Sequence, residues 1–204
     1  MELCRFIPPR PRAKECLPLS DAPTTEVHVR VICTQLAATL NAVAAARRCA
    51  PDAEALYRQS GALPRPVRAE IAFAAGGLCA HEYYFRSLLP HRKGGLPPAV
   101  HAALCRSIGA ADSFFYIFRE EAQRMRAGGF LWLCAERPGG RLHLIPCAGY
   151  ELPDAAYTPL LALDLWEHAY LPRWGGDRRG YADAFLAQLA WEEIARGVSF
   201  SACS

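Results

Sequence analysis

Lysine is nearly missing from this chain of 204 residues. Among 23 basic residues it occurs only at Lys14 and Lys93, and the others are arginine. Against 20 acidic residues the net charge is +3, so the chain lacks the strong positive field of a dedicated nucleic-acid-binding domain. Arginine favours planar, bidentate contacts, so some of these side chains could lie in interfaces. A bias in the composition of the coding DNA explains the same excess equally well.

The nine cysteines lack the spacing of a metal-binding or disulfide-bonded framework. No two of them form a C-x-x-C pair, and their number is odd, which argues against a zinc ribbon and against a secreted disulfide scaffold. Most of them lie in apolar stretches, where a reduced cysteine packs as a small hydrophobic residue. We therefore expect a protein that is not secreted and that works in a reducing compartment, the cytoplasm or the mitochondrial matrix.

Long apolar runs are also missing. None approaches the roughly 20 residues that cross a lipid bilayer, and residues 1–16 contain no apolar segment of the signal-peptide kind. Pro8, Pro9 and Pro11 would disrupt an amphipathic targeting helix. The chain contains no G-x-S-x-G, P-loop or H-E-x-x-H motif, which argues against the common hydrolase classes. We expect no membrane partner.

Apolar residues make up 52% of the chain, which is enough for a sizeable core. In the first half, helical periodicity and punctuation by proline and glycine predict two long helices joined by a loop. Gly76 and Gly77 are expected to interrupt the second helix. The expected segments are a proline-rich extension at 1–22, a helix at Glu26–Arg48, a loop at Ala50–Pro66 and a helix at Val67–Leu89. Together they indicate an antiparallel helical hairpin domain over 23–92.

The second half changes from helical periodicity to short apolar runs, which indicate strands. Its expected elements are helices at Pro98–Ile108 and Asp112–Ala127, with Asp112 as N-cap, strands at Phe130–Ala135, Arg141–Pro146 and Leu160–Leu163, and a closing helix at Tyr181–Arg196. We therefore predict an α+β fold. A helical hairpin precedes an α/β domain over 93–204, which has a small three-stranded antiparallel sheet and flanking helices.

Potential metal ligands are concentrated in three segments. His28 and His81 each lie on the apolar face of a predicted helix, and Asp164 lies four residues before His168. Taken singly, such a histidine is more often a hydrogen-bonded core residue than a ligand. Asp164 and His168 could equally be a local pair on one helix face. It is their combination that points to a metal site.

The segment Asp164–Tyr170 reads D-L-W-E-H-A-Y and resembles the D-x-W-E-H-A-Y signature of the iron/manganese superoxide dismutase family. Phe73–His81, with aromatic residues after it, is similar to a second signature of that family, in which a glycine-rich segment precedes a ligand histidine. His28 lies thirteen residues before Asn41, where the family has its first ligand and a Leu-Asn pair. The resemblance extends over about residues 26–196.

The resemblance implies a mononuclear site in which His28, His81, Asp164 and His168 hold one iron or manganese ion. Three imidazoles and one carboxylate suit either metal, so the sequence does not choose between them. The implied reaction is the conversion of superoxide to dioxygen and hydrogen peroxide. In it the ion cycles by one electron, and the groups around the ligands tune its potential.

Several positions depart from the family pattern. Where the family has a channel tyrosine, a channel histidine and a tyrosine hydrogen-bonded to that histidine across the dimer interface, this chain has Leu36, Ile32 and Leu171. The asparagine that precedes the second ligand is replaced by Ala80. Loss of both members of the histidine–tyrosine pair avoids a buried polar group without a partner.

The resemblance implies that this chain retains other features of the family. His143 falls where the family has a solvent-binding glutamine, and Arg178 matches an arginine near the channel mouth. Glu167 matches the glutamate that reaches a ligand histidine of the partner subunit. The resemblance thus implies catalytic roles for these three residues. It also implies a homodimer, or a heterodimer with a related chain, through the Glu167/His168 region.

Two functions from different classes remain open at this stage. The first is a divergent superoxide dismutase. The second is a catalytically impaired dismutase-like subunit of a larger assembly, such as the small subunit of the mitochondrial ribosome. In the second case ribosomal RNA and proteins would be the partners, and the arginine excess and the basic N-terminal extension would serve those contacts.

Overall fold

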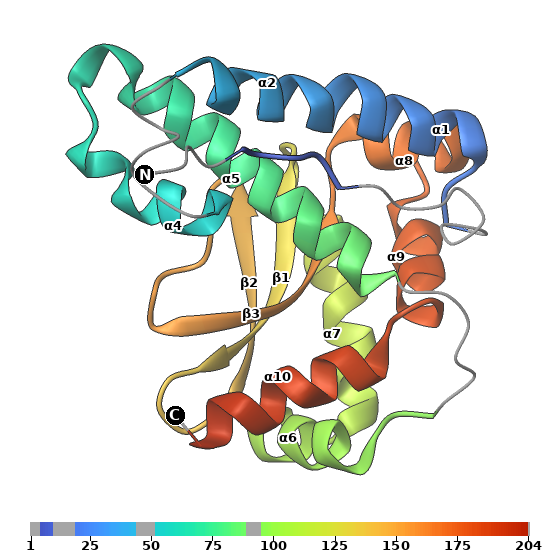
Figure 1. Ribbon diagram of the computed structural model, residues 1–204. Helices are drawn as coiled ribbons and strands as arrows, with labels where there is room; N and C mark the ends of the chain where they lie inside the picture. Colours follow the sequence, from blue (N-terminus) through green and yellow to red (C-terminus); the bar gives the residue numbers. More distant parts are fainter. Residues whose placement is uncertain (1–4, 10–18, 44–51, 89–94, 204) are drawn as a thin grey trace.

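The computed structural model describes residues 5–9, 19–43, 52–88 and 95–203, and Figure 1 shows their arrangement. Helices fill the first half, and a three-stranded sheet with flanking helices forms the second. The predicted α+β class is confirmed. Within the described residues, no helix is both long and apolar enough to cross a membrane. The division of the chain at residues 22 and 92 stays a prediction.

The first helical segment is a continuous rod with a wide turn in its middle. It consists of α1 (Ala22–Val27), a π-helical stretch (His28–Cys33) and α2 (Thr34–Ala42). The carboxylate of Asp21 accepts the amide N–H of Thr24 at 2.8 Å and so caps the first turn. The helix therefore begins earlier than the predicted Glu26, while the predicted end at Arg48 lies outside the described residues.

A helix also forms where a loop was predicted. α4 spans Ala53–Gln59, and a short 3₁₀ turn follows at Ser60–Ala62. The side chain of Asp52 accepts the amide N–H of Ala55 at 2.8 Å, which supplies the N-cap that helix needs. The prediction of a loop over Ala50–Pro66 was therefore wrong for these residues.

α5 runs without a break over Arg65–Ser87, so Gly76 and Gly77 do not interrupt it. Both glycines are sites of close approach. A β-carbon on Gly76 would lie 2.1 Å from the carbonyl oxygen of Tyr150, and one on Gly77 would lie 2.8 Å from its ring. The two glycines allow the loop after the second strand to press against α5. α2 and α5 lie side by side above one end of the sheet (Figure 1).

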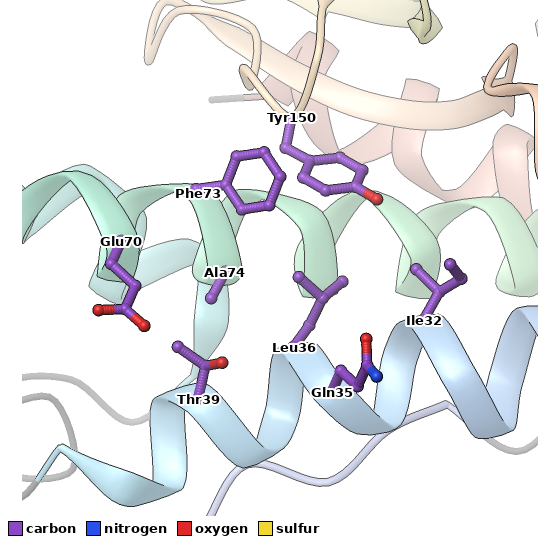
Figure 2. Close-up of a pocket in the computed structure, with 8 residues that line it drawn as sticks. All are labelled: Ile32, Gln35, Leu36, Thr39, Glu70, Phe73, Ala74 and Tyr150. Atoms are coloured by element: carbon purple, nitrogen blue, oxygen red, sulfur yellow. The ribbon is translucent and has the colours of Figure 1, made fainter.

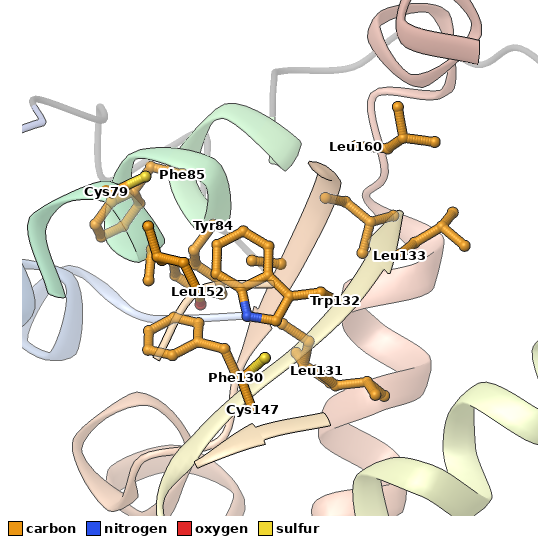
Figure 3. Packing of buried hydrophobic residues seen from close by; sticks show 14 of the residues in the cluster. Cys79, Tyr84, Phe85, Phe130, Leu131, Trp132, Leu133, Cys147, Leu152 and Leu160 are labelled. Atoms are coloured by element: carbon orange, nitrogen blue, oxygen red, sulfur yellow. The ribbon is translucent and has the colours of Figure 1, made fainter. Parts of the chain in front are cut away.

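The sheet has the order β2-β1-β3, and all its pairs are antiparallel. Its strands are β1 (Gly129–Glu136), β2 (Leu142–Ala148) and β3 (Tyr157–Asp164). The central strand β1 is buried on both faces along nearly its whole length. Figure 3 shows Trp132, Phe130 and Leu131 of this strand among the packed side chains of the core. Three antiparallel strands were predicted, and this is confirmed.

Five helices complete the second half of the described chain: α6 (Pro98–Ile108), α7 (Ala111–Arg124), α8 (Glu167–Trp174), α9 (Arg178–Ala187) and α10 (Trp191–Cys203). Asp112 lies in the first turn of α7 and is not its N-cap, which is Ala110. The single closing helix predicted over Tyr181–Arg196 is two helices. Between them the amide of Ala190 bonds to the carbonyl of Ser87, at the end of α5, so the backbone leaves the helical path.

Candidate metal centre

Asp164 is the last residue of β3, and His168 lies in the first turn of α8. The backbone reverses between them because Oδ1 of Asp164 accepts the amide N–H of Trp166 at 2.8 Å. The other carboxylate oxygen, Oδ2, lies 3.2 Å from Nε2 of His168. The two residues are therefore brought together by a strand-to-helix turn, and not by one helix face.

Two histidines from the first half of the chain meet this pair. Nε2 of His28, at the start of the π-helical stretch, lies 3.1 Å from Oδ2 of Asp164. Nε2 of His81, within α5, lies 3.5 Å from the same oxygen. The potential ligand atoms of the four residues all lie within 4.8 Å of one another. The structure thus brings together all four residues predicted as metal ligands.

The tautomer of His81 is fixed by its backbone neighbour. Its Nδ1 lies 2.6 Å from the carbonyl oxygen of Gly77, which can only accept a hydrogen bond, so Nδ1 carries the proton. In the neutral ring Nε2 then holds a lone pair, which faces the carboxylate of Asp164 at 3.5 Å. Two acceptors in contact repel each other unless a cation lies between them. The donor set therefore fits a metal ion.

Burial strengthens this conclusion. His81 and Asp164 are fully buried, and His28 is 1% exposed. Among the described residues, Nε2 of His28 and Nε2 of His81 have no hydrogen-bond partner, and a buried polar atom of this kind is costly. Only His168 is partly accessible, with 17% of its side chain exposed. Access to the cluster is therefore narrow.

The protonation states match those of metal ligands. Burial lowers the pKa of His28, and it lowers the pKa of His81 to about 3, with the charge of His28 acting in the same direction. Burial alone would raise the pKa of Asp164, but His168 and His28 beside it bring that pKa well below its usual range. At neutral pH the cluster therefore offers neutral imidazoles of His28 and His81 and an ionised carboxylate.

Aromatic side chains enclose the cluster. The ring of His28 lies 5.3 Å from that of Tyr84 and 4.9 Å from that of Phe85, measured between centroids. The ring of His81 lies 5.5 Å from that of Phe130. Such a shell limits the entry of water and lowers the local dielectric constant, which strengthens the electrostatic interactions within the site.

His143, for which the resemblance implied a catalytic, solvent-binding role, lies away from this cluster. It pairs with Cys134 in the sheet register, whereas Asp164 pairs with Phe130 at the other end of β1. Four residues of strand correspond to about 13 Å. The ring of His143 packs 5.4 Å from that of Tyr157, and its Nε2 lies 3.3 Å from Glu136. The turn of the hairpin is what places His143 at the wrong end of the sheet.

The residue that sequence reasoning missed is Tyr150, which follows β2 in the loop beside α5. Its ring centroid lies 5.6 Å from that of His81 and 5.2 Å from that of Trp166. The only signal in the sequence is the position of a Gly-Tyr pair directly after an apolar run. That pattern also fits an ordinary turn.

The other two residues with predicted catalytic roles, Glu167 and Arg178, belong to α8 and α9. Glu167 is exposed at the start of α8. Arg178 donates hydrogen bonds to the hydroxyl of Tyr170, at 2.7 Å, and to the carbonyl of Met125. Its guanidinium group also lies 4.9 Å from the centroid of the Tyr170 ring. Arg178 thereby connects α9 with α8.

Two of the four departures from the family pattern, Ile32 and Leu36, line one groove. A groove of about 330 Å³ runs between the first helical rod and α5, as Figure 2 shows. Its lining residues are Ile32, Gln35, Leu36, Thr39, Glu70, Phe73, Ala74 and Tyr150. Away from the groove, Ala80 is buried within α5, and Leu171 is 45% exposed on α8.

Similarity to known proteins agrees with this geometry. A family model described as iron/manganese superoxide dismutases, C-terminal domain, matches residues 97–197. A superoxide dismutase (Mn) of Pseudomonas aeruginosa is 30% identical over 193 residues, which are 93% of this chain and 95% of that relative. A superoxide dismutase (Mn/Fe) of Methylomonas sp. (strain J) is 29% identical with the same coverage. A mitochondrial superoxide dismutase (Mn) of Aspergillus fumigatus is 28% identical over 131 residues, 62% of each chain.

Proposed function

We propose that this chain, which belongs to the iron/manganese superoxide dismutase family, is a superoxide dismutase with one iron or manganese ion. His28, His81, Asp164 and His168 would hold the ion. Two superoxide anions and two protons would give one dioxygen and one hydrogen peroxide. Homologues named for manganese or for manganese and iron support this choice of metals.

The observation that carries the proposal is the pairing of His81 with Asp164. A lone pair on Nε2 faces a carboxylate oxygen at 3.5 Å in a fully buried position. A structural core would place a donor opposite that oxygen. A cation between the two atoms removes the repulsion, and His28 and His168 complete its ligands.

When bound, the ion supplies one-electron chemistry: it takes an electron from one superoxide and gives an electron to another. The protein residues set the charge, the protonation state and the water content of the site. Asp164 contributes the one negative charge of the cluster, the carbonyl of Gly77 keeps the proton of His81 on Nδ1, and the aromatic shell excludes bulk water. The partly exposed His168 marks the accessible side.

Reconstitution tests this function. Metal-free protein is loaded separately with iron and with manganese, and superoxide dismutation is measured on each sample, with chelator-treated protein as the control. We expect activity with at least one metal and none after chelation. A fully loaded protein that is inactive with both metals would contradict the proposal.

An impaired, structural subunit remains the second candidate, because two apolar side chains, Ile32 and Leu36, line the groove beside the cluster. Ile32 and Leu36 offer no hydrogen bond there, which in this second candidate would weaken proton delivery at these two positions. A protein that binds metal, gains stability from it and shows no turnover would favour this function. Co-purification with ribosomal small subunits would then identify the assembly.

For its partner chain and compartment we keep the expectations from the sequence. Glu167 and Leu171 are both exposed on α8, which supports a homodimer or a related heterodimer through the Glu167/His168 region. Light scattering of the parent and of Glu167→Ala tests this. The proposed compartment is the mitochondrial matrix or the cytoplasm, and cell fractionation distinguishes them.

A further inference from the structure

Tyr150 lies between the groove and the metal cluster. Only 8% of it is exposed. One side of its ring meets the cluster, with centroid distances of 5.6 Å to His81 and 5.2 Å to Trp166. The other side lines the groove, where its ring lies 4.7 Å from that of Phe73. A single side chain therefore contacts both spaces.

The position of Tyr150 is tightly determined by α5. Its carbonyl oxygen packs on Gly76 and its ring packs on Gly77. Both contacts are so close that neither glycine has room for a β-carbon. Gly77 is also the residue whose carbonyl holds Nδ1 of His81. The ring is thus fixed one helical turn away from a proposed ligand, with little freedom to move aside.

The hydroxyl of Tyr150 lies at the inner end of the groove, whose other polar lining residues are Gln35, Thr39 and Glu70. Figure 2 shows it directed away from Phe73 and toward the side of Ile32. Ile32 and Leu36 line the groove near it, and neither side chain can form a hydrogen bond. A tyrosine hydroxyl carries a proton at neutral pH, so it can donate a hydrogen bond there.

We propose that Tyr150 closes the inner end of this groove over the metal cluster and donates a hydrogen bond from its hydroxyl to a small anion bound at the ion. The inference rests on the proposed function, because the anion binds at this site only when a metal ion is present. It assigns two separable tasks to Tyr150. The ring forms the barrier between the groove and the metal cluster, and the hydroxyl favours an anion that can accept a hydrogen bond.

The hydroxyl is tested with Tyr150→Phe in the iron-loaded protein. Azide is titrated and its binding is followed by optical absorption, so the measurement does not depend on turnover. Loss of one hydrogen bond to the anion should raise the dissociation constant about five- to tenfold. The matched control is Tyr157→Phe, because Tyr157 packs against His143 at the far end of the sheet. Its azide affinity should equal that of the parent.

The ring is tested with Tyr150→Ala. Removing the barrier should join the groove to the cluster and speed the release of iron to a chelator such as EDTA, whereas Tyr150→Phe should release iron at the parent rate. The phenylalanine variant keeps the ring and is expected to fold like the parent. It therefore carries the test of the hydroxyl even if the alanine variant does not fold.

The outcomes separate this inference from the proposed function. A parent protein that takes up no metal overturns both. A metal-loaded parent whose azide affinity is the same in Tyr150→Phe overturns the hydroxyl assignment alone. A folded Tyr150→Ala that releases iron no faster than the parent overturns the barrier alone.

Discussion

At the scale of single residues, the site depends on which atoms hold protons. The carbonyl of Gly77 fixes the proton of His81 on Nδ1, 2.6 Å away. Burial keeps His28 and His81 neutral, and Asp164 stays ionised because His168 and His28 lie beside it. Each of these states is the one that a metal ligand requires. The same states make the metal-free cluster sensitive to acid.

Without metal, the protein should lose stability as the pH falls. The pKa of His81 is about 3 in the folded chain, against a usual value of 6.5, so the unfolded chain binds more protons between these values and stability falls as the pH drops through that window. The lowered pKa of Asp164 acts in the same direction below its usual 3.8. The measurement is the thermal midpoint of the metal-free protein from pH 8 to pH 4.

The control for this prediction is His81→Gln, which removes one of the titrating groups. Its thermal midpoint should depend less steeply on pH than that of the parent. Equal slopes in the two proteins would contradict the role assigned to burial of His81.

At the scale of elements, close approaches decide the geometry. α5 carries His81 and accepts Tyr150 against Gly76 and Gly77, while the turn from β3 to α8 brings Asp164 and His168 together. Arg178 then joins α9 to α8 beside that turn. The cluster is therefore held by contacts between elements, each of which a substitution can test.

Gly77→Ala should destabilise the protein. Its new β-carbon would lie 2.8 Å from the ring of Tyr150 and 2.9 Å from the side chain of Leu36, and overpacking of this kind costs about 1–3 kcal/mol. Gly76→Ala should cost more, because the atom in its way is a backbone oxygen. Gly61→Ala is the control, since no heavy atom lies within 4 Å of its new β-carbon. Urea denaturation measures the three differences, and equal stabilities would contradict the close packing.

Arg178→Lys should lower stability by about 1–2 kcal/mol, because a lysine cannot reproduce the fork that serves Tyr170 and Met125. The exposed neighbour Arg179 supplies the control variant Arg179→Lys. Both variants keep the positive charge, so the comparison separates geometry from charge. If instead only the salt dependence of dismutation changed, Arg178 would act by attracting the anion.

At the scale of the whole molecule, the cluster joins the two halves of the chain. His28 and His81 come from the helical half, and Asp164 and His168 come from the sheet and the helix after it. An ion bound at all four would connect these halves, so its binding free energy adds to the free energy of folding. Metal removal should therefore lower the unfolding temperature of the entire protein.

Sequence patterns predicted those parts of the molecule that depend on short stretches. The D-L-W-E-H-A-Y segment located Asp164 and His168, and resemblance to the family's other motifs, at Phe73–His81 and at Asn41, located His81 and His28. Contacts between residues far apart in the sequence could not be predicted from these short patterns. The glycine pair in α5 was taken for a break because its partner, Tyr150, lies far away in the sequence.

His143 was misplaced for a related reason. The register of a hairpin depends on the length of its turn, and motif spacing alone does not give that length. The structure pairs His143 with Cys134 and leaves Tyr150 beside the cluster. The position of each residue relative to β2, His143 within the strand and Tyr150 in the loop after it, thus decided which of the two meets the metal site.

The central claim is that four residues hold one ion, and the most direct measurement is the metal content per chain by elemental mass spectrometry. The account predicts close to one iron or manganese ion in the parent and almost none in His81→Ala or Asp164→Ala. His101→Ala, which changes an exposed histidine on α6, should keep the parent content. Unchanged metal in the first two variants, or a parent that stays empty after refolding with either metal, would contradict the account.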